Sequence, residues 1–142
     1  MTHKPHAFWL IKSEPSTWSW ADQVARGTEP WEGVRNYQAR NNLKAMHMGD
    51  LCFFYHSVKE RSIVGIVEVA SDYRLDPTDH DGVFGLVDVK TVRRLKKPIC
   101  LDQIKLVPAL QDMALLKQSR LSVQPVTADE WKVILQLSGD QE

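Results

Sequence analysis

Two neighbouring runs of aromatic and β-branched residues constrain the fold most strongly, because together they have the pattern of a β-hairpin. Residues 51–58 and 62–70 are both short and rich in Phe, Tyr, Ile and Val, which is typical of strands. The gap between them, residues 59–62 at its widest, has the length of a hairpin turn. The middle of the chain is therefore predicted to be a pair of antiparallel strands.

Further short strands and helices are expected on both sides of this hairpin. Strands are predicted in aromatic or β-branched runs, and helices where apolar residues recur at spacings of three and four or follow a capping residue. The predicted strands cover 8–13, 83–93 and 120–125, with Pro98 interrupting the chain after the second of these. The predicted helices run from Ser16 or Thr17 to Ala25, over 36–47, over 101–106, over 114–118 and from Thr127 onward, and 28–33 and 72–82 are predicted loops.

Capping signals accompany two of the predicted helices. Gly49 follows the helix over 36–47, where a residue in the left-handed conformation is wanted as a C-cap. Thr127 and Glu130 have the spacing of a capping box at the start of the last helix. In that helix the residues expected to face inward are Trp131, Ile134 and Leu135, or alternatively Val133 and Leu137.

The irregular mixture of strands and helices favours an α+β fold on a curved or barrel-like sheet. The chain has 142 residues, without an internal repeat or a shift in composition that would mark a linker, so residues 1–142 are expected to form one domain. Residues 1–6 are polar and contain Pro5, and they are expected to be disordered.

The charge balance excludes a protein that coats DNA without selectivity. The sequence has 18 basic and 18 acidic residues and a formal net charge of zero. Binding that is dominated by phosphate neutralisation usually comes with a basic surface. A local basic patch around one pocket remains compatible with this balance.

Cysteine usage and hydropathy predict a cytoplasmic protein without a membrane anchor. Cys52 and Cys100 are too few for a disulfide framework. The sequence shows neither a signal-peptide pattern nor an apolar run of membrane-spanning length. The histidines and cysteines lack zinc spacing, and the oxygen-rich stretch 76–82 lacks the last glutamate of an EF-hand loop, so neither a metal nor a cofactor is expected.

The first candidate site segment is the strand over 8–13, which runs into Glu14-Pro15. Strand alternation places Trp9 and Ser13 on one face and Lys12 on the other. From spacing alone, an edge strand with a solvated lysine is the favoured explanation, since lone lysines usually lie on the surface.

The second candidate segment, residues 33–42, opens a predicted helix with an unusual density of arginine and amide side chains. Amides offer a donor and an acceptor together, which suits the edge of a nucleobase. Arginine can stack on a base or hold a phosphate. A solvated helix face with Asn36 as its N-cap explains the composition equally well. The candidate residues are Arg35, Asn36, Tyr37, Gln38, Arg40 and Asn41.

Two more candidate segments have polar residues at or along a strand. At the end of 51–58 such residues either face a cleft or run out into solvent with His56 as a neutral imidazole, and the second is slightly favoured. Along 120–125 every second residue is polar, which fits a lined pocket or a solvated face. The residues concerned are Tyr55, His56, Ser57, Arg120, Ser122 and Gln124.

Together these segments resemble the EVE domain, a branch of the PUA-like superfamily that is related to YTH domains. The resemblance spans nearly the whole chain, from about Phe8 to the last helix, and the block at 33–42 is its most specific part. The matching motifs are W-L-I-K-S-E-P at 9–15, W-E-G-V-R-N-Y-Q-A-R-N-N at 31–42, G-D at 49–50, Y-H-S at 55–57 and R-L-S-V-Q-P at 120–125.

The resemblance implies a PUA-like fold, in which a curved mixed β-sheet closes toward a barrel with short helices around it. It also implies a binding module, not an enzyme, that captures a methylated or hydroxymethylated cytosine or adenine. The expected partner is modified DNA or RNA, and the expected state is a monomer. Three alternatives stay open: RNA binding without modification selectivity, a hydrolase of nucleic acid or nucleotides with His56 as general base, and an adaptor for a peptide or metabolite.

In the base-capture hypothesis, a nucleotide leaves its stack and its base enters the pocket. Stacking is assigned to Trp9 or Tyr37, with Trp31 as a further candidate, while Lys12, Arg35 and Arg40 are placed near backbone phosphates. His56 is a candidate for either task. Edge contacts are assigned to Asn36, Gln38, Asn41, Ser57, Ser122 and Gln124, and Ser13, Tyr55 and Arg120 complete the predicted site.

Overall fold

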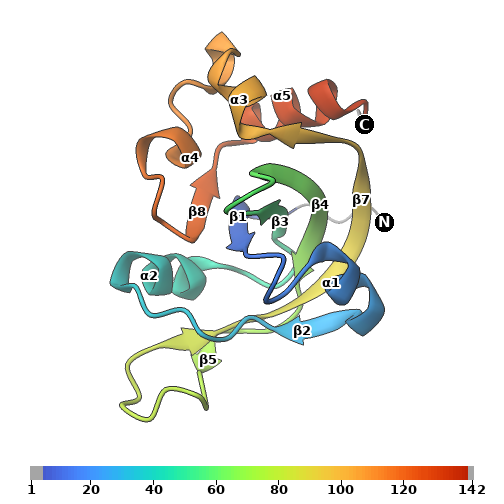
Figure 1. Cartoon of the computed structure of the whole chain (residues 1–142). Helices are drawn as coiled ribbons and strands as arrows, with labels where there is room; N and C mark the ends of the chain where they lie inside the picture. Colours follow the sequence, from blue (N-terminus) through green and yellow to red (C-terminus); the bar gives the residue numbers. More distant parts are fainter. Residues whose placement is uncertain (1–4, 141–142) are drawn as a thin grey trace.

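A six-stranded mixed β-sheet is the centre of the computed structural model, which describes residues 5–140 (Figure 1). β4 and β7 bend around β1 and β3, so the sheet curls toward a barrel, as the sequence led us to expect. Across the sheet the strands are β2 (Thr28–Pro30), β7 (Asp88–Cys100), β4 (Ser62–Val69), β3 (Leu51–His56), β1 (Phe8–Ser13) and β8 (Val123–Val126).

Short helices surround this sheet. Within it, β1 is parallel to β3, and the other neighbouring pairs of strands are antiparallel. The predicted hairpin is confirmed, since β3 and β4 pair antiparallel from Leu51 opposite Glu68 to His56 opposite Ser62. The remaining elements are α1 (Trp20–Arg26), α2 (Tyr37–Ala45), α3 (Leu101–Lys105), the 3₁₀ turn η1 (Pro108–Leu110), α4 (Ala114–Lys117), α5 (Ala128–Ser138) and a separate two-stranded sheet of β5 (Arg74–Leu75) and β6 (Gly85–Leu86).

Both faces of the sheet are covered, so the molecule has two apolar clusters. Successive residues of β1 point to opposite faces, and accordingly Trp9 and Ile11 join one cluster while Leu10 joins the other. Residues of α1 and α2 complete the first cluster, and residues of α3, α4 and α5 complete the second (Figure 1). This burial on two sides explains why the central strands have nearly continuous apolar sequences.

Pro98 does not interrupt the chain as predicted, because β7 runs through it to Cys100. Ile63 pairs with Ile99 and Gly65 pairs with Arg94, so residues 95–98 all lie opposite Val64. Such a bulge leaves residues out of the hydrogen-bond ladder, and a proline is tolerated there because no partner requires its missing N–H.

The start of α1 and the end of α2 also differ from the sequence prediction. Residues 14–18 form a turn, in which the N–H groups of Thr17 and Trp18 both donate to the Glu14 carbonyl. Ser19, not Ser16 or Thr17, therefore caps α1 and forms a capping box with Asp22.

α2 begins at the predicted N-cap, Asn36, whose side chain accepts the N–H of Ala39. It ends at Ala45 because the next N–H groups leave the helical pattern, and that of His47 donates to the Asp50 carboxylate. Gly49, with φ +92°, belongs to the turn before β3 and is not the C-cap.

Three strands begin or end at other residues than predicted because of local hydrogen bonding. Residues 28–30, a predicted loop, form the edge strand β2 against β7. The predicted strand over 83–93 divides into β6 and the start of β7, and β6 pairs with β5 inside the predicted loop. The predicted strand over 120–125 begins only at Val123, because the N–H of Leu121 closes a turn onto the Gln118 carbonyl.

The last helix begins as predicted, with a capping box of Thr127 and Glu130. It buries Trp131 and Ile134 against the sheet, and the ring of Trp131 stacks on Phe53 at 3.8 Å between centroids. After the helix, the carboxylate of Asp140 accepts the backbone N–H of Lys96 at 2.8 Å. This contact fixes the end of α5 to β7.

Of residues 1–6, which are predicted to be disordered, residues 1–4 lie outside the described part of the chain, and His6 makes contacts with the fold. The backbone N–H groups of His6 and Ala7 donate to Asp50 at 3.0 and 3.1 Å. The His6 ring also stacks on that of His47, with the centroids 4.3 Å apart. His6 therefore belongs to the folded structure.

Gly65→Ala is expected to destabilise the fold, because an added Cβ would lie only 2.4 Å from the ring of Trp20. Overpacking of this kind costs about 1–3 kcal/mol of unfolding free energy, measured by urea denaturation. In a Trp20→Leu background the same substitution should cost clearly less, since the smaller side chain leaves room for the methyl group. Equal costs in both backgrounds would contradict this explanation.

Candidate functional site

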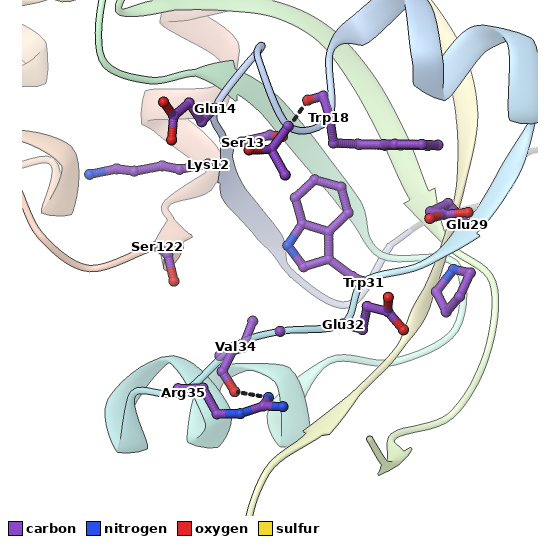
Figure 2. Close-up of a pocket in the computed structure, with 13 residues that line it drawn as sticks. Lys12, Ser13, Glu14, Trp18, Glu29, Trp31, Glu32, Val34, Arg35 and Ser122 are labelled. Carbon is purple, nitrogen blue, oxygen red and sulfur yellow. Dashed lines mark hydrogen bonds between the residues drawn. The ribbon is translucent and has the colours of Figure 1, made fainter. Parts of the chain in front are cut away.

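A pocket of about 510 Å³ opens at the carboxyl end of β1 (Figure 2). Three separate stretches of chain build it: the end of β1 with the turn that follows, the segment from β2 to the start of α2, and the loop before β8. Its lining consists of Lys12, Ser13, Glu14, Thr17, Trp18, Glu29, Pro30, Trp31, Glu32, Gly33, Val34, Arg35 and Ser122.

The turn after β1 is held by Ser13 and Trp18. The Ser13 hydroxyl donates a short hydrogen bond to the Trp18 carbonyl, and the Ser13 carbonyl accepts the N–H of Ser57 at 2.9 Å. The indole N–H of Trp18 donates to Oε1 of Gln23 at 2.9 Å, while Gln23 is itself buried. The Trp18 ring is therefore fixed on the upper wall of the pocket in Figure 2.

Trp31 forms the middle of the lining and has an unused hydrogen-bond donor. Its backbone N–H donates to Val87, and its ring packs edge-on against Phe54 at 5.6 Å, so only 8% of the residue is exposed. Within residues 5–140 the indole N–H finds no acceptor. Figure 2 shows this nitrogen on the side of the ring that faces Ser122. The pocket therefore offers a donor to a ligand.

A buried carboxylate outside the pocket, that of Asp76, positions the lower rim. Asp76 is 1% exposed and accepts the N–H of Gly33 at 2.8 Å, a hydrogen bond from Arg35 at 3.2 Å, and two from Thr78. Burial alone would raise the pKa of Asp76, but the hydrogen bonds from Thr78, Gly33 and Arg35 outweigh it and lower the pKa to about 2. Gly33 and Arg35 of the rim are thus held by hydrogen bonds to the ionised carboxylate of Asp76.

Lys12 and the loop before β8 form the opposite rim. The backbone N–H of Lys12 donates to the Ser122 carbonyl at 2.9 Å, and its ammonium group donates to the Ser119 carbonyl at 2.6 Å. Burial lowers the pKa of Lys12. The side-chain amide of Gln124 adds hydrogen bonds to the carbonyls of Gln118 and Leu121, so this loop is anchored at several points.

Charge in the lining is mixed: Glu14, Glu32 and Arg35 are exposed, and Glu29 and Lys12 are partly buried. Glu14, Glu29 and Glu32 belong to the lining, opposed by Lys12 and Arg35. Glu29 is partly neutralised by Arg26 at 3.3 Å. The pocket can therefore receive a ligand that has hydrogen-bond donors of its own, while the rims can meet an anion.

Five of the predicted site residues line the pocket: Lys12, Ser13, Trp31, Arg35 and Ser122. Four others are buried elsewhere. Trp9 lies in the core, where its indole N–H donates to Asp50 at 3.0 Å, and Tyr55 lies in the cluster on the other side of the sheet. Gln124 holds the loop before β8, and among the described residues its Oε1 has no hydrogen-bond partner.

His56, the fourth of these, has both ring nitrogens engaged. Its Nε2 lies 2.9 Å from the backbone nitrogen of Trp20, which can only donate, so Nε2 must be the unprotonated acceptor. Nδ1 then carries the proton toward Glu60, at 2.9 Å. The side chain of His56 therefore connects β3 to the start of α1 by a hydrogen bond.

The remaining predicted residues lie outside the pocket lining. Asn36 is the N-cap of α2, and Ser57 donates its N–H to Ser13 just beyond the pocket wall. The others are on the outer side of α2 or in the loop before β8, and all except Arg40 are well exposed: Tyr37, Gln38, Arg40, Asn41 and Arg120.

Eight lining residues were not among the predicted site residues, and the charged and aromatic ones among them are Glu14, Trp18, Glu29 and Glu32. The abundance of tryptophan, five in 142 residues, is the signal that could have identified Trp18. The glutamates carry no such signal, because isolated acidic residues in loops are usually solvated. In the described part of the chain no group of three or more His, Cys, Asp or Glu side chains is arranged to hold a metal ion.

The curled sheet with a pocket at the end of its first strand defines a PUA-like domain. The chain also matches the family described as EVE domain over residues 7–137, and it belongs to that family. Thymocyte nuclear protein 1 from Gallus gallus is 36% identical, over 96% of this chain and 70% of the relative. The family and the fold that the sequence motifs predicted are thus confirmed.

Solved structures give the same result. A Rhodopseudomonas palustris protein determined by NMR is 51% identical and superposes with a TM-score of 0.91, covering 96% of this chain and 95% of that chain. The human THYN1 protein, determined in complex with 5-methylcytosine-containing DNA, is 34% identical with a TM-score of 0.88, covering 96% and 99%. A YTH domain from Zygosaccharomyces rouxii, at 18% identity and a TM-score of 0.61, shares the fold.

The predicted cytoplasmic location requires correction. The curated vertebrate relatives are named thymocyte nuclear protein 1, and this name points to the nucleus. Composition could not have indicated this, because reduced cysteines are equally typical of cytosolic and nuclear proteins. Over residues 5–140, no helix is both long and apolar enough to cross a membrane.

Asp76→Asn is expected to lower the unfolding free energy by about 2 kcal/mol at neutral pH, because it removes a carboxylate whose pKa is about 2 in the fold and near 3.9 when unfolded. A lowered pKa stabilises above the unfolded value, so the difference between the two proteins should be full above about pH 4 and shrink toward pH 2. Urea denaturation across that range measures it.

Asp81→Asn is the matched control, because Asp81 is exposed and its carboxylate makes no hydrogen bond within residues 5–140. It should change the unfolding free energy little at any pH. A loss in Asp76→Asn that stays constant with pH would show that packing, and not the ionised carboxylate, stabilises the rim.

Proposed function

We propose that this protein captures a modified nucleobase of DNA or RNA in the pocket at the end of β1. The observation that carries the proposal is a half-enclosed pocket of about 510 Å³ that combines tryptophan rings, an unpaired indole N–H and carboxylates. Its size lies within the range of small-ligand sites, about 300–1,000 Å³. The human THYN1 protein, of the same family, has been crystallised with 5-methylcytosine-containing DNA, which supports this reading.

The polar groups of the pocket favour a base with an exocyclic amino group. A glutamate accepts from the N4 amino group of cytosine, and an adenine N6 amino group offers the same donor. Glu14 or Glu32 would take this part, while the indole N–H of Trp31 would donate to a ring nitrogen or a carbonyl oxygen of the base. Methylated or hydroxymethylated cytosine and methylated adenine are therefore the ligands proposed.

The free energy gained by binding a base in the pocket can balance the cost of flipping it out of its stack. Flipping a base out of a duplex costs a few kcal/mol, and less from an open strand. One aromatic stack returns about 1–3 kcal/mol, for which Trp18 and Trp31 are the rings available in the pocket. Hydrogen bonds in the pocket supply the selectivity, and Lys12 and Arg35 at its rims are placed to meet backbone phosphates.

The non-enzymatic reading rests on how His56 is used. A general base needs a free lone pair within reach of its substrate. The lone pair on Nε2 faces the N–H of Trp20, and Nδ1 faces Glu60, so the ring is engaged on both sides. Since His56 also lies outside the pocket lining, the hydrolase alternative loses its proposed base.

We further propose that residues 1–142 act as one domain and as a monomer.

The test is a titration of short single-stranded DNA and RNA, followed by tryptophan fluorescence at fixed salt. The strands carry methylated or hydroxymethylated cytosine, methylated adenine, or no modification. At least tenfold tighter binding to one modified strand, about 1.4 kcal/mol, supports base capture and identifies the base. Equal, salt-sensitive binding to all strands would instead indicate a backbone-binding protein, and no binding would contradict the proposal.

Trp31→Phe tests the role of the indole N–H, because it keeps an aromatic ring and removes the donor. We expect the affinity for the preferred strand to fall about tenfold, the effect of losing a hydrogen bond that leaves a ligand acceptor unpaired. Trp131→Phe is the matched control, since Trp131 packs on the far side of the sheet in the other apolar cluster. Unchanged affinity in Trp31→Phe would remove this donor from the proposed mechanism.

A further inference from the structure

A second surface, next to the pocket, combines an exposed aromatic ring with arginines. Tyr37, at the start of α2, is 62% exposed although it is a large aromatic residue. The guanidinium of Arg40 lies 5.0 Å from the centre of its ring, and that of Arg35 lies 5.8 Å from the ring of Phe84. We call these four residues, Arg35, Tyr37, Arg40 and Phe84, the α2 platform.

The exposed ring of Tyr37 packs against Phe84 and Arg40 of the platform. The rings of Tyr37 and Phe84 contact each other with their centroids 5.2 Å apart. The loop that carries Phe84 is fixed from within, because the Asp79 carboxylate accepts the N–H groups of Val83 and Phe84 at 2.9 and 2.7 Å. Tyr37 thus packs against a ring whose loop is fixed by backbone hydrogen bonds.

The charge of the platform suits a phosphate backbone. Arg40 donates to the side chain of Asn41 and the carbonyl of Val83, and within residues 5–140 it forms no ion pair with a carboxylate. Lys44, one turn further along α2, lies over the ring of Tyr73 at 5.7 Å and is likewise without an ion pair among the described residues. Exposed aromatic rings beside cations are the usual elements of single-strand binding surfaces.

Arg35 connects the platform to the pocket. Its side chain lines the lower rim in Figure 2 and also lies against Phe84. Its hydrogen bonds to Asp76 and Thr78, at 3.2 and 3.0 Å, hold it in this place. A nucleic-acid strand with one base in the pocket would therefore continue across Arg35 toward Tyr37.

We propose that the α2 platform binds the nucleotide next to the captured one, with Tyr37 stacking on its base and Arg40 contacting its phosphate. The occupant is a single-stranded stretch of the same DNA or RNA, and the inference rests on the proposed function of the pocket. It gives Tyr37 a different role from the one predicted from the sequence, where it was a candidate to stack on the captured base.

The test uses two single-stranded DNAs that each carry one 5-methylcytosine, one with ordinary neighbours and one in which abasic residues replace the flanking nucleotides. Both strands keep the phosphates, and only the first has bases for Tyr37. In Tyr37→Ala we expect about tenfold weaker binding of the ordinary strand, as for loss of one stacked base, and unchanged binding of the abasic strand. Tyr37→Phe should bind both strands like the parent protein.

Trp31→Phe separates this inference from the proposed function, because a pocket variant should weaken both strands equally. If Tyr37→Ala binds the ordinary strand as tightly as the parent, or weakens both strands alike, the platform is overturned while the pocket stands. If the parent binds neither of these strands nor any other modified strand of the titration under Proposed function, both proposals fail.

Discussion

A single buried carboxylate, that of Asp50, connects the start of β1 to the rest of the sheet. Asp50 is fully buried, and four N–H groups donate to it: the backbone groups of His6, Ala7 and His47 and the indole of Trp9. An isolated buried charge is costly, so these donors must remain in place for the fold to persist. Since Asp50 directly precedes β3, the contact sets β1 beside β3, in parallel.

The pocket depends on this position of β1. Because β1 lies between β3 and β8, its end meets the turn after β3 through Ser13 and Ser57, and the loop before β8 through Lys12 and Ser122. The third wall comes from the segment after β2, which is fixed from outside by Asp76. Stretches far apart in the sequence thus form one site, although no single stretch would form it alone.

The residues of the motif at 33–42 have three different roles in the structure: some cap the helix or pack in the core, some line the pocket, and others lie on the outer surface. Asn36 caps α2, as the alternative of a solvated helix face predicted, and Ala39 and Leu43 face the core. Arg35 lies before the helix and reaches the pocket, whereas Tyr37 points to the outer surface. Within the helix, the periodicity of about 3.6 residues per turn puts Tyr37 on a different side from Ala39 and Leu43.

The sequence by itself determined the family, the central hairpin, most of the strands and helices, and the capping boxes or N-caps at Asn36 and Thr127, because these follow from motifs and local periodicity. It also indicated Lys12, Ser13, Trp31, Arg35 and Ser122, all of which line the pocket. The tertiary structure alone decided that Trp9 and His56 are engaged inside the fold and that Trp18 and three glutamates join the pocket. The physical reason is that a side chain's surroundings are set by strand order and loop contacts over long sequence separations, and residue spacing carries no information on these.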